Sequence, residues 1–127
     1  MKRLLYVALA FTLGTLIATT TPAQIPDTYT NLKVLPKDIK KAQLMQHMKT
    51  FSKALGVRCH FCHKGEEGKS LSTYDFASDE NYHKDMARVM MTMTHKINTE
   101  LLKDFKDGQF AQIKCITCHR GEKEPKE

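Results

Sequence analysis

The four cysteines of this chain occur in two C-x-x-C pairs, and a histidine directly follows each pair. The first segment, CHFCH, spans residues 59–63, and the second, CITCH, spans residues 115–119. In this pattern two thiols form thioether bonds with one porphyrin, and the histidine next to them binds its iron. The sequence therefore predicts two covalently attached haem c groups. The attachment residues are Cys59, Cys62, Cys115 and Cys118, and the adjacent iron ligands are His63 and His119.

Other uses of paired cysteines fit the pattern less well. Two C-x-x-C pairs that share a structural zinc ion are usually about 15–20 residues apart, and the gap from Cys62 to Cys115 is far longer. A redox dithiol normally lies in a longer βαβ pattern, which is not visible in this sequence. Neither of these sites, nor a pair of disulfides, explains a histidine after both pairs, so haem is favoured.

The N-terminal segment has the three parts of a secretory signal peptide. Lys2 and Arg3 give a positive start, residues 4–17 form an apolar run, and Ala23 is a small residue at the expected cleavage site. The run is shorter than the roughly 20 residues of a membrane span, which makes an uncleaved anchor the weaker alternative. We expect cleavage near Ala23, a periplasmic location, and one dihaem cytochrome c domain over residues 24–127.

Size and charge limit the partners that we expect. A domain of about 100 residues buries a modest fraction of its surface, so bound haem would supply much of the core. The formal net charge is +6, but part of it belongs to the signal peptide and the haem propionates would offset most of the rest. We therefore expect no nucleic acid partner. The expected partners are redox proteins, in a membrane-associated electron-transfer complex.

An amphipathic helix is predicted before the first motif, over residues 35–56. Pro36 suits its first position, Asp38 lies in its expected first turn, and Gly56 is placed to end it in a left-handed cap. Its apolar face is formed, at helical spacing, by Leu44, Met48, Phe51 and Leu55.

A second helix is predicted over residues 80–105, with Ser78 as its cap, and a loop over 106–114 leads to the second motif. The fold class is therefore all-α, with two helix–turn–CxxCH units packed around two covalent haems and little or no sheet. The apolar stripe of this helix consists of Met86, Met90, Met93, Ile97 and Leu101.

Methionines on both predicted helices are candidates for the sixth iron ligand, because a thioether sulfur favours ferrous iron and raises the potential. Helical spacing does not choose between Met90 and Met93 and does not reject Met45, one turn before Met48. Histidine could replace either methionine and give a bis-histidine haem of lower potential. The histidines outside the attachment motifs are His47, His60, His83 and His95.

In combination, these features resemble one half of the tetrahaem cytochrome subunit of photosynthetic reaction centres and the short dihaem cytochromes related to it. The resemblance implies Met48 and Met90 as the sulfur ligands of the two haems. The family's further histidine ligand after Ile-Asn is missing here, in agreement with two haems. The lipid-bearing N-terminal cysteine of some family members is also missing, so the resemblance does not by itself imply docking on a reaction centre. The matching stretches are residues 31–36, Met48, 55–59, 87–93, 97–99 and 115–121.

The function predicted from these motifs is electron transfer between partners, with both irons six-coordinate. A dihaem peroxidase or small-molecule reductase would need an open iron position and usually more chain to shape a pocket. A haem-based sensor would use ligand exchange or docking as its output. We therefore expect an electron carrier and no enzymatic activity.

Overall fold

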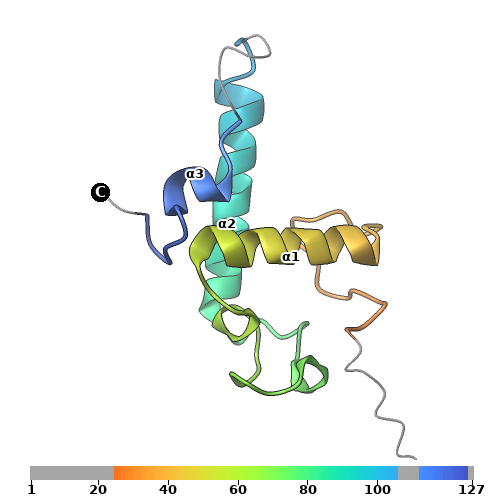
Figure 1. Cartoon of the computed structure of the whole chain (residues 1–127). Helices are drawn as coiled ribbons and strands as arrows, with labels where there is room; N and C mark the ends of the chain where they lie inside the picture. Colours follow the sequence, from red (N-terminus) through yellow and green to blue (C-terminus); the bar gives the residue numbers. More distant parts are fainter. Residues whose placement is uncertain (1–24, 106–111, 126–127) are drawn as a thin grey trace, which may run out of the picture.

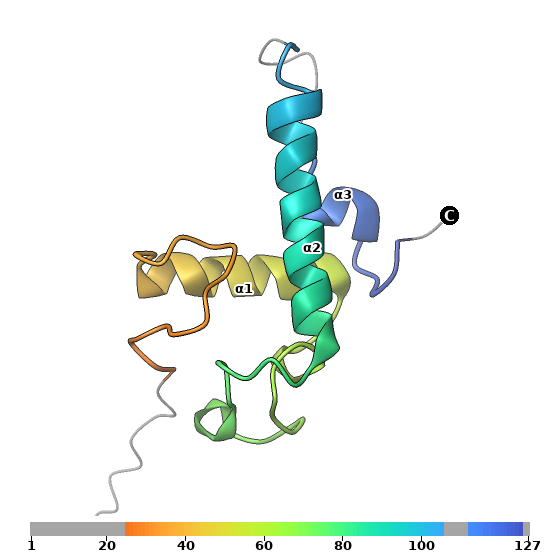
Figure 2. The ribbon, with the colours of Figure 1, turned by 180° about the vertical axis from the view of Figure 1, so that it is seen from behind.

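A computed structural model of the chain describes residues 25–105 and 112–125. Every regular element in these ranges is helical, which confirms the all-α prediction; the β structure there is limited to an isolated bridge between Lys64 and Asp75. The long helices α1 and α2 cross, and the short α3 lies beside α2 near the crossing (Figure 1, Figure 2). The elements are α1 (Lys41–Leu55), the 3₁₀ turns η1 (Cys59–Phe61) and η2 (Leu71–Thr73), α2 (Tyr82–Lys96), the π-helical turn η3 (Ile97–Leu101) and α3 (Cys115–His119).

Two predicted segments lie wholly or partly outside the described residues. The signal peptide over 1–23 is one, and most of the loop over 106–114 is the other. Among the residues that are described, no helix has the length and apolar character to cross a bilayer.

Helix α1 ends as predicted but begins later. Gly56 adopts the left-handed conformation (φ 64°) directly after Leu55. The start predicted near Pro36 is wrong, because the Ile39 N–H donates to the Pro36 carbonyl (3.2 Å) in a separate turn. The backbone is extended at Lys40, whose N–H donates to Oε1 of Gln43 (3.2 Å) and so closes the helix start. Asp38 therefore precedes the helix and does not interact with its dipole from the first turn.

Helix α2 begins at Tyr82, two residues after the predicted start, and its cap is Asn81. The Asn81 Oδ1 accepts from the His83 N–H (3.1 Å), which is the usual capping interaction. Ser78, the predicted cap, accepts instead from the Glu80 N–H within the preceding loop (3.2 Å). At its other end α2 continues into η3, so the predicted helix spans an α-helix and a π-helical turn.

The polypeptide contributes little core of its own. Among the described residues only two apolar side chains are buried, Leu44 (8% exposed) and Ala54 (2%). Apolar side chains of α2 remain open instead, including Met86 (49%), Val89 (61%) and Met93 (46%). An apolar stripe on one helix face normally packs against a partner surface, so this arrangement fits a fold built around a large apolar cofactor.

The end of the second motif packs directly on the end of α1. The Gly121 N–H donates to the Ala54 carbonyl (2.8 Å). A Cβ atom added to Gly56 would collide with the Gly121 carbonyl oxygen. Glycine at position 56 is therefore required by both its left-handed backbone and this close approach. The contact brings the two CxxCH segments into one structural unit.

Candidate haem-binding sites

The first CxxCH segment forms a tight turn. The Cys59 carbonyl accepts hydrogen bonds from the N–H groups of Cys62 (3.2 Å) and His63 (2.9 Å), and these bonds close the 3₁₀ turn. Both thiols are free and partly buried. Burial raises the pKa of the Cys62 thiol, and the neighbouring Cys59 raises it further. One turn thus presents two thiols and a histidine together, as attachment to a single porphyrin requires.

The second segment forms the short helix α3. The Lys114 N–H donates to the Thr117 hydroxyl (3.0 Å), and the Thr117 N–H donates to the Lys114 carbonyl (2.9 Å). Burial raises the pKa of the Cys115 thiol. Nδ1 of His119 lies 3.1 Å from the Glu122 carbonyl. Because a carbonyl only accepts, Nδ1 carries the proton there, and Nε2 is left as the ligating atom.

His63 is held in a more apolar setting. Its ring lies edge-on to Phe76, with 5.1 Å between the ring centroids. Nδ1 is buried and makes no hydrogen bond of normal length and angle. Burial, and then the positive charge of Lys84, lower the pKa of His63 to about 4, while hydrogen bonding to the Phe76 backbone acts in the opposite direction. The ring is therefore neutral at pH 7, which is the form that binds a metal ion.

Two asparagines tie the attachment segments to α2 and to the η3 turn that continues it, and neither role was predicted from the sequence. Asn81, besides capping α2, donates from Nδ2 to the Phe61 carbonyl (2.9 Å) in the first turn. Asn98 pairs with the backbone of Ile113 through two bonds of 2.8 Å each, just before the second motif. Asparagine before a helix is a capping signal that the sequence shows. The pairing of Asn98 depends on a contact between distant residues and could not be predicted in this way.

A cluster of charged side chains centred on Asp79 fixes the N-terminal segment against α2, and it too was not predicted. Asp79 accepts hydrogen bonds from Lys33 (2.6 Å) and Asn31 (2.9 Å), and it pairs with Lys84 (3.3 Å) and Arg88 (2.9 Å). These bonds, led by that from Lys33, hold the pKa of Asp79 well below its usual range.

The predicted sulfur ligands lie on the two long helices. Met48 is on α1 and Met90 is on α2, and both side chains are partly buried. The alternative Met45 is also partly buried, whereas Met93 is 46% exposed. Because a bound haem would itself cover these faces, exposure does not choose among them. The roles of Met48 and Met90 stay predictions.

The remaining histidines occupy different surroundings. His83 is partly buried, with Nδ1 at 3.0 Å from Oδ1 of Asn81 and its ring 4.0 Å from the Phe61 ring between centroids. Nε2 of His60 lies 3.9 Å from a Glu67 carboxylate oxygen. His47 and His95 are exposed.

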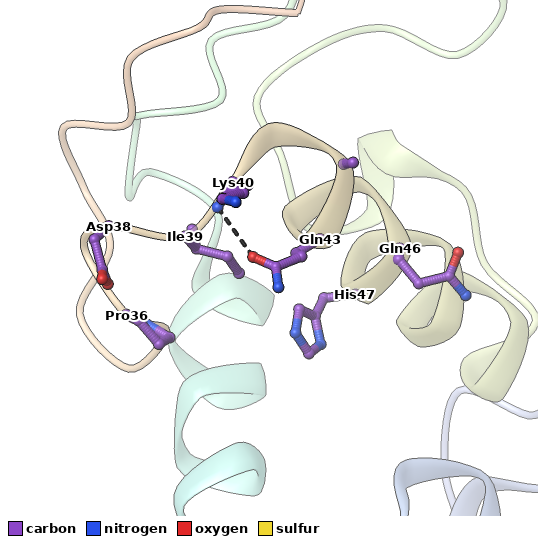
Figure 3. Close-up of a pocket in the computed structure, with 8 residues that line it drawn as sticks. Pro36, Asp38, Ile39, Lys40, Gln43, Gln46 and His47 are labelled. Atoms are coloured by element: carbon purple, nitrogen blue, oxygen red, sulfur yellow. Dashed lines mark hydrogen bonds between the residues drawn. The ribbon is translucent and has the colours of Figure 1, made fainter.

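A hollow beside the first half of α1 lies apart from the attachment segments (Figure 3). Helical geometry places its α1 residues on the side away from Met48. We therefore do not assign it to haem binding. The residues that line it are Pro36, Asp38, Ile39, Lys40, Ala42, Gln43, Gln46 and His47.

The donor set fits covalently bound haem. Each site combines two free thiols with an imidazole, and exposed apolar side chains of α2 are available to cover a porphyrin. Within the described ranges, no three histidine, cysteine or acidic side chains gather as a metal-binding group, so the two pairs do not converge on a shared zinc site. Together, the helical fold and the two CxxCH turns define a c-type cytochrome, a class of electron-transfer proteins.

Comparison with known proteins identifies the family. Residues 16–127 match the family described as photosynthetic reaction centre cytochrome C subunit, and the chain belongs to it. The chain is 34% identical over 97 residues to cytochrome c-554 of Chloroflexus aurantiacus, covering 76% of this chain and 21% of that protein. It is 35% identical over 69 residues to the photosynthetic reaction center cytochrome c subunit of Rubrivivax gelatinosus, covering 54% and 16%. The resemblance stated from the sequence is confirmed, and the chain spans a small part of these longer relatives.

Proposed function

We propose that this chain is an exported electron carrier that holds two haem c groups, each with histidine and methionine as axial ligands. The observation that carries the proposal is the presence of two separate CxxCH turns, one tied to the start of α2 and the other to the η3 turn that continues α2. Asn81 bonds to the first turn, and Asn98 bonds to the backbone that leads into the second. One helix therefore holds both attachment sites in a single small domain, which favours electron exchange between them.

Each group of residues has a distinct role in this proposal. Cys59, Cys62, Cys115 and Cys118 tether the porphyrins, so that neither cofactor is lost outside the cytoplasm. His63 and His119 would ligate the two irons, together with Met48 and Met90. Bound haem supplies one-electron chemistry, because its iron alternates between the ferrous and ferric states. The methionine sulfurs favour the ferrous state and block the position that a substrate would need.

Family membership supports a carrier over the two alternatives, a small dihaem peroxidase or reductase and a haem-based sensor. Both alternatives need an iron with a free or exchangeable position. We expect that ferrous protein binds no carbon monoxide at neutral pH, as measured by Soret absorption. Carbon monoxide binding together with peroxide turnover would favour the enzyme instead.

The proposed setting is the periplasm, with redox proteins as partners. The signal-like segment over residues 1–23 supports export. The name of the Rubrivivax gelatinosus relative places that protein in a photosynthetic reaction center, which supports a membrane-associated electron-transfer complex as the setting for this chain. No feature of the sequence calls for a nucleic acid partner.

Haem number and ligation are tested on protein made in a host that matures c-type cytochromes. We expect two haems per chain by pyridine haemochrome assay and mass, and iron–methionine bands in the near-infrared spectrum. The double variant Cys115→Ser/Cys118→Ser keeps one haem, and the matched variant Cys59→Ser/Cys62→Ser keeps the other. Colourless protein, bound zinc, or a single haem in the parent would refute the proposal.

A further inference from the structure

The two proximal histidines differ at the ring nitrogen that does not face iron. Nδ1 of His119 donates to the Glu122 carbonyl at 3.1 Å. Nδ1 of His63 is buried and makes no hydrogen bond of normal length and angle, and the polar interaction of this ring is with the Phe76 backbone. A hydrogen bond from the second nitrogen makes a ligating imidazole more basic. A more basic ligand stabilises ferric iron, so this difference lowers the reduction potential at His119 relative to that at His63.

The packing of the first site acts in the same direction. His63 packs edge-on against Phe76, and the thiol of Cys62 is partly buried. Ferric haem carries one more positive charge than ferrous haem, and a less solvated site disfavours the form with the extra charge. Burial therefore raises the potential of the first site.

A partly buried cation lies beside the first site. The Lys84 side chain is 12% exposed, and its Nζ donates to the carbonyls of Phe76 (2.9 Å), Ala77 (3.1 Å) and Ser78 (2.7 Å). These bonds hold the ammonium group against the residue whose ring contacts His63. A positive charge in a poorly solvated place acts over a longer range than one in water.

The other charges near Lys84 carry both signs and leave no positive excess. Arg88, which is 14% exposed, and Lys33 are cations. Asp79, the 60% exposed Asp85 and the exposed Asp75, which accepts from the N–H groups of Ala77 and Ser78, are carboxylates. Lys84 is the least solvated of these charges, at 12% exposed. Around the second motif the cations are solvated, and salt screens exposed charges. The exposed cations there are Lys114 and Arg120.

We propose that the haem held by Cys59, Cys62 and His63 has the higher reduction potential of the two, and that Lys84 raises it. This inference rests on the proposed function, because it requires both haems. With both haems bound, electrons would distribute towards the first site. Lys84 acts on the first site through its charge and does not contact either iron ligand.

The test is a redox titration of the holoprotein and four variants, with both midpoint potentials resolved. Lys84→Gln removes the charge and keeps a polar side chain. It should decrease both midpoint potentials or only the higher one, and the decrease of the higher potential should be several-fold larger than that of the lower potential. A tenfold change in the electron equilibrium between the haems corresponds to about 59 mV. Lys84→Arg keeps the charge and should restore most of the higher potential.

Two further variants test the charge argument. Lys64→Gln is the matched control, because Lys64 directly follows His63 but its side chain is 52% exposed, and neither potential should change appreciably. Asp79→Asn removes a negative charge from the same cluster and should raise the higher potential. This opposite sign keeps the inference testable even if Lys84→Gln does not fold.

The inference is overturned if Lys84→Gln shifts the lower potential more than the higher one, shifts both equally, or shifts neither. It is also overturned if Lys84→Arg behaves like Lys84→Gln, or if Asp79→Asn lowers the higher potential. A parent protein with a single haem would refute the proposed function instead. Two resolved haems without an effect of Lys84 would refute the inference alone.

Discussion

The contact between Gly56 and Gly121 makes a sharp prediction about stability. Gly56→Ala places a Cβ on a residue with φ of 64°, and a left-handed conformation costs a non-glycine residue about 1–2 kcal/mol. The same Cβ would collide with the Gly121 carbonyl oxygen. To relieve the collision, the chain must separate at the hydrogen bond from Gly121 to Ala54, which contributes about 1 kcal/mol. We expect Gly56→Ala to lower the free energy of unfolding by about 2–4 kcal/mol.

Gly68 provides a matched control within the same chain. It also has a positive φ (77°), but an added Cβ would meet no atom within 4 Å. Gly68→Ala therefore carries the conformational cost of about 1–2 kcal/mol without the collision.

The assay is thermal and denaturant unfolding of the holoproteins, followed by far-ultraviolet circular dichroism. A gap of about 1–2 kcal/mol between the variants corresponds to roughly 5–10 °C in Tm for a domain of this size. If Gly56→Ala is no less stable than Gly68→Ala, the close approach between the two motifs does not hold the protein together.

Two further predictions concern a ligand and a charge. Met48→Ala should keep both haems attached but lower one potential or open one iron to carbon monoxide, and unchanged potentials and spectra would exclude Met48 as a ligand. Asp79→Asn should lower Tm at neutral pH. Because the folded pKa of Asp79 lies below its ordinary value of 3.8, its contribution is present above that value and is lost as the pH falls further. The Tm gap between parent and Asp79→Asn should therefore narrow below about pH 4, and a gap that widens in acid would contradict the pairing of Asp79 with its cations.

Features that depend on a few neighbouring residues were predictable from the sequence. The CxxCH spacing identified the class of protein, because the attachment chemistry depends on residues within one turn. The helix end at Gly56 was predicted because glycine alone adopts the left-handed cap without strain. The long second helix was predicted because its apolar residues recur at helical spacing over many turns.

Features that depend on distant contacts were not predictable. Pro36 is a good first helical residue, but its turn with Ile39 and the bond from Lys40 to Gln43 moved the helix start to Lys41. Ser78 and Asn81 are both good caps, and local sequence does not choose between them. The partners of Asp79 reach back to Lys33, 46 residues away, and nothing in the sequence near Asp79 indicates that distance.

The pair of hydrogen bonds between Asn98 and Ile113 has a consequence for how this protein tolerates insertions. It fixes the chain on both sides of the connection from η3 to α3. The second motif therefore takes its position from this anchor and does not depend on the length of chain between the two residues. Each doubling of the length of a closed loop adds only about 0.6 kcal/mol to the entropic cost of closing it. Insertions in this connection should therefore leave the position of the second CxxCH segment unchanged.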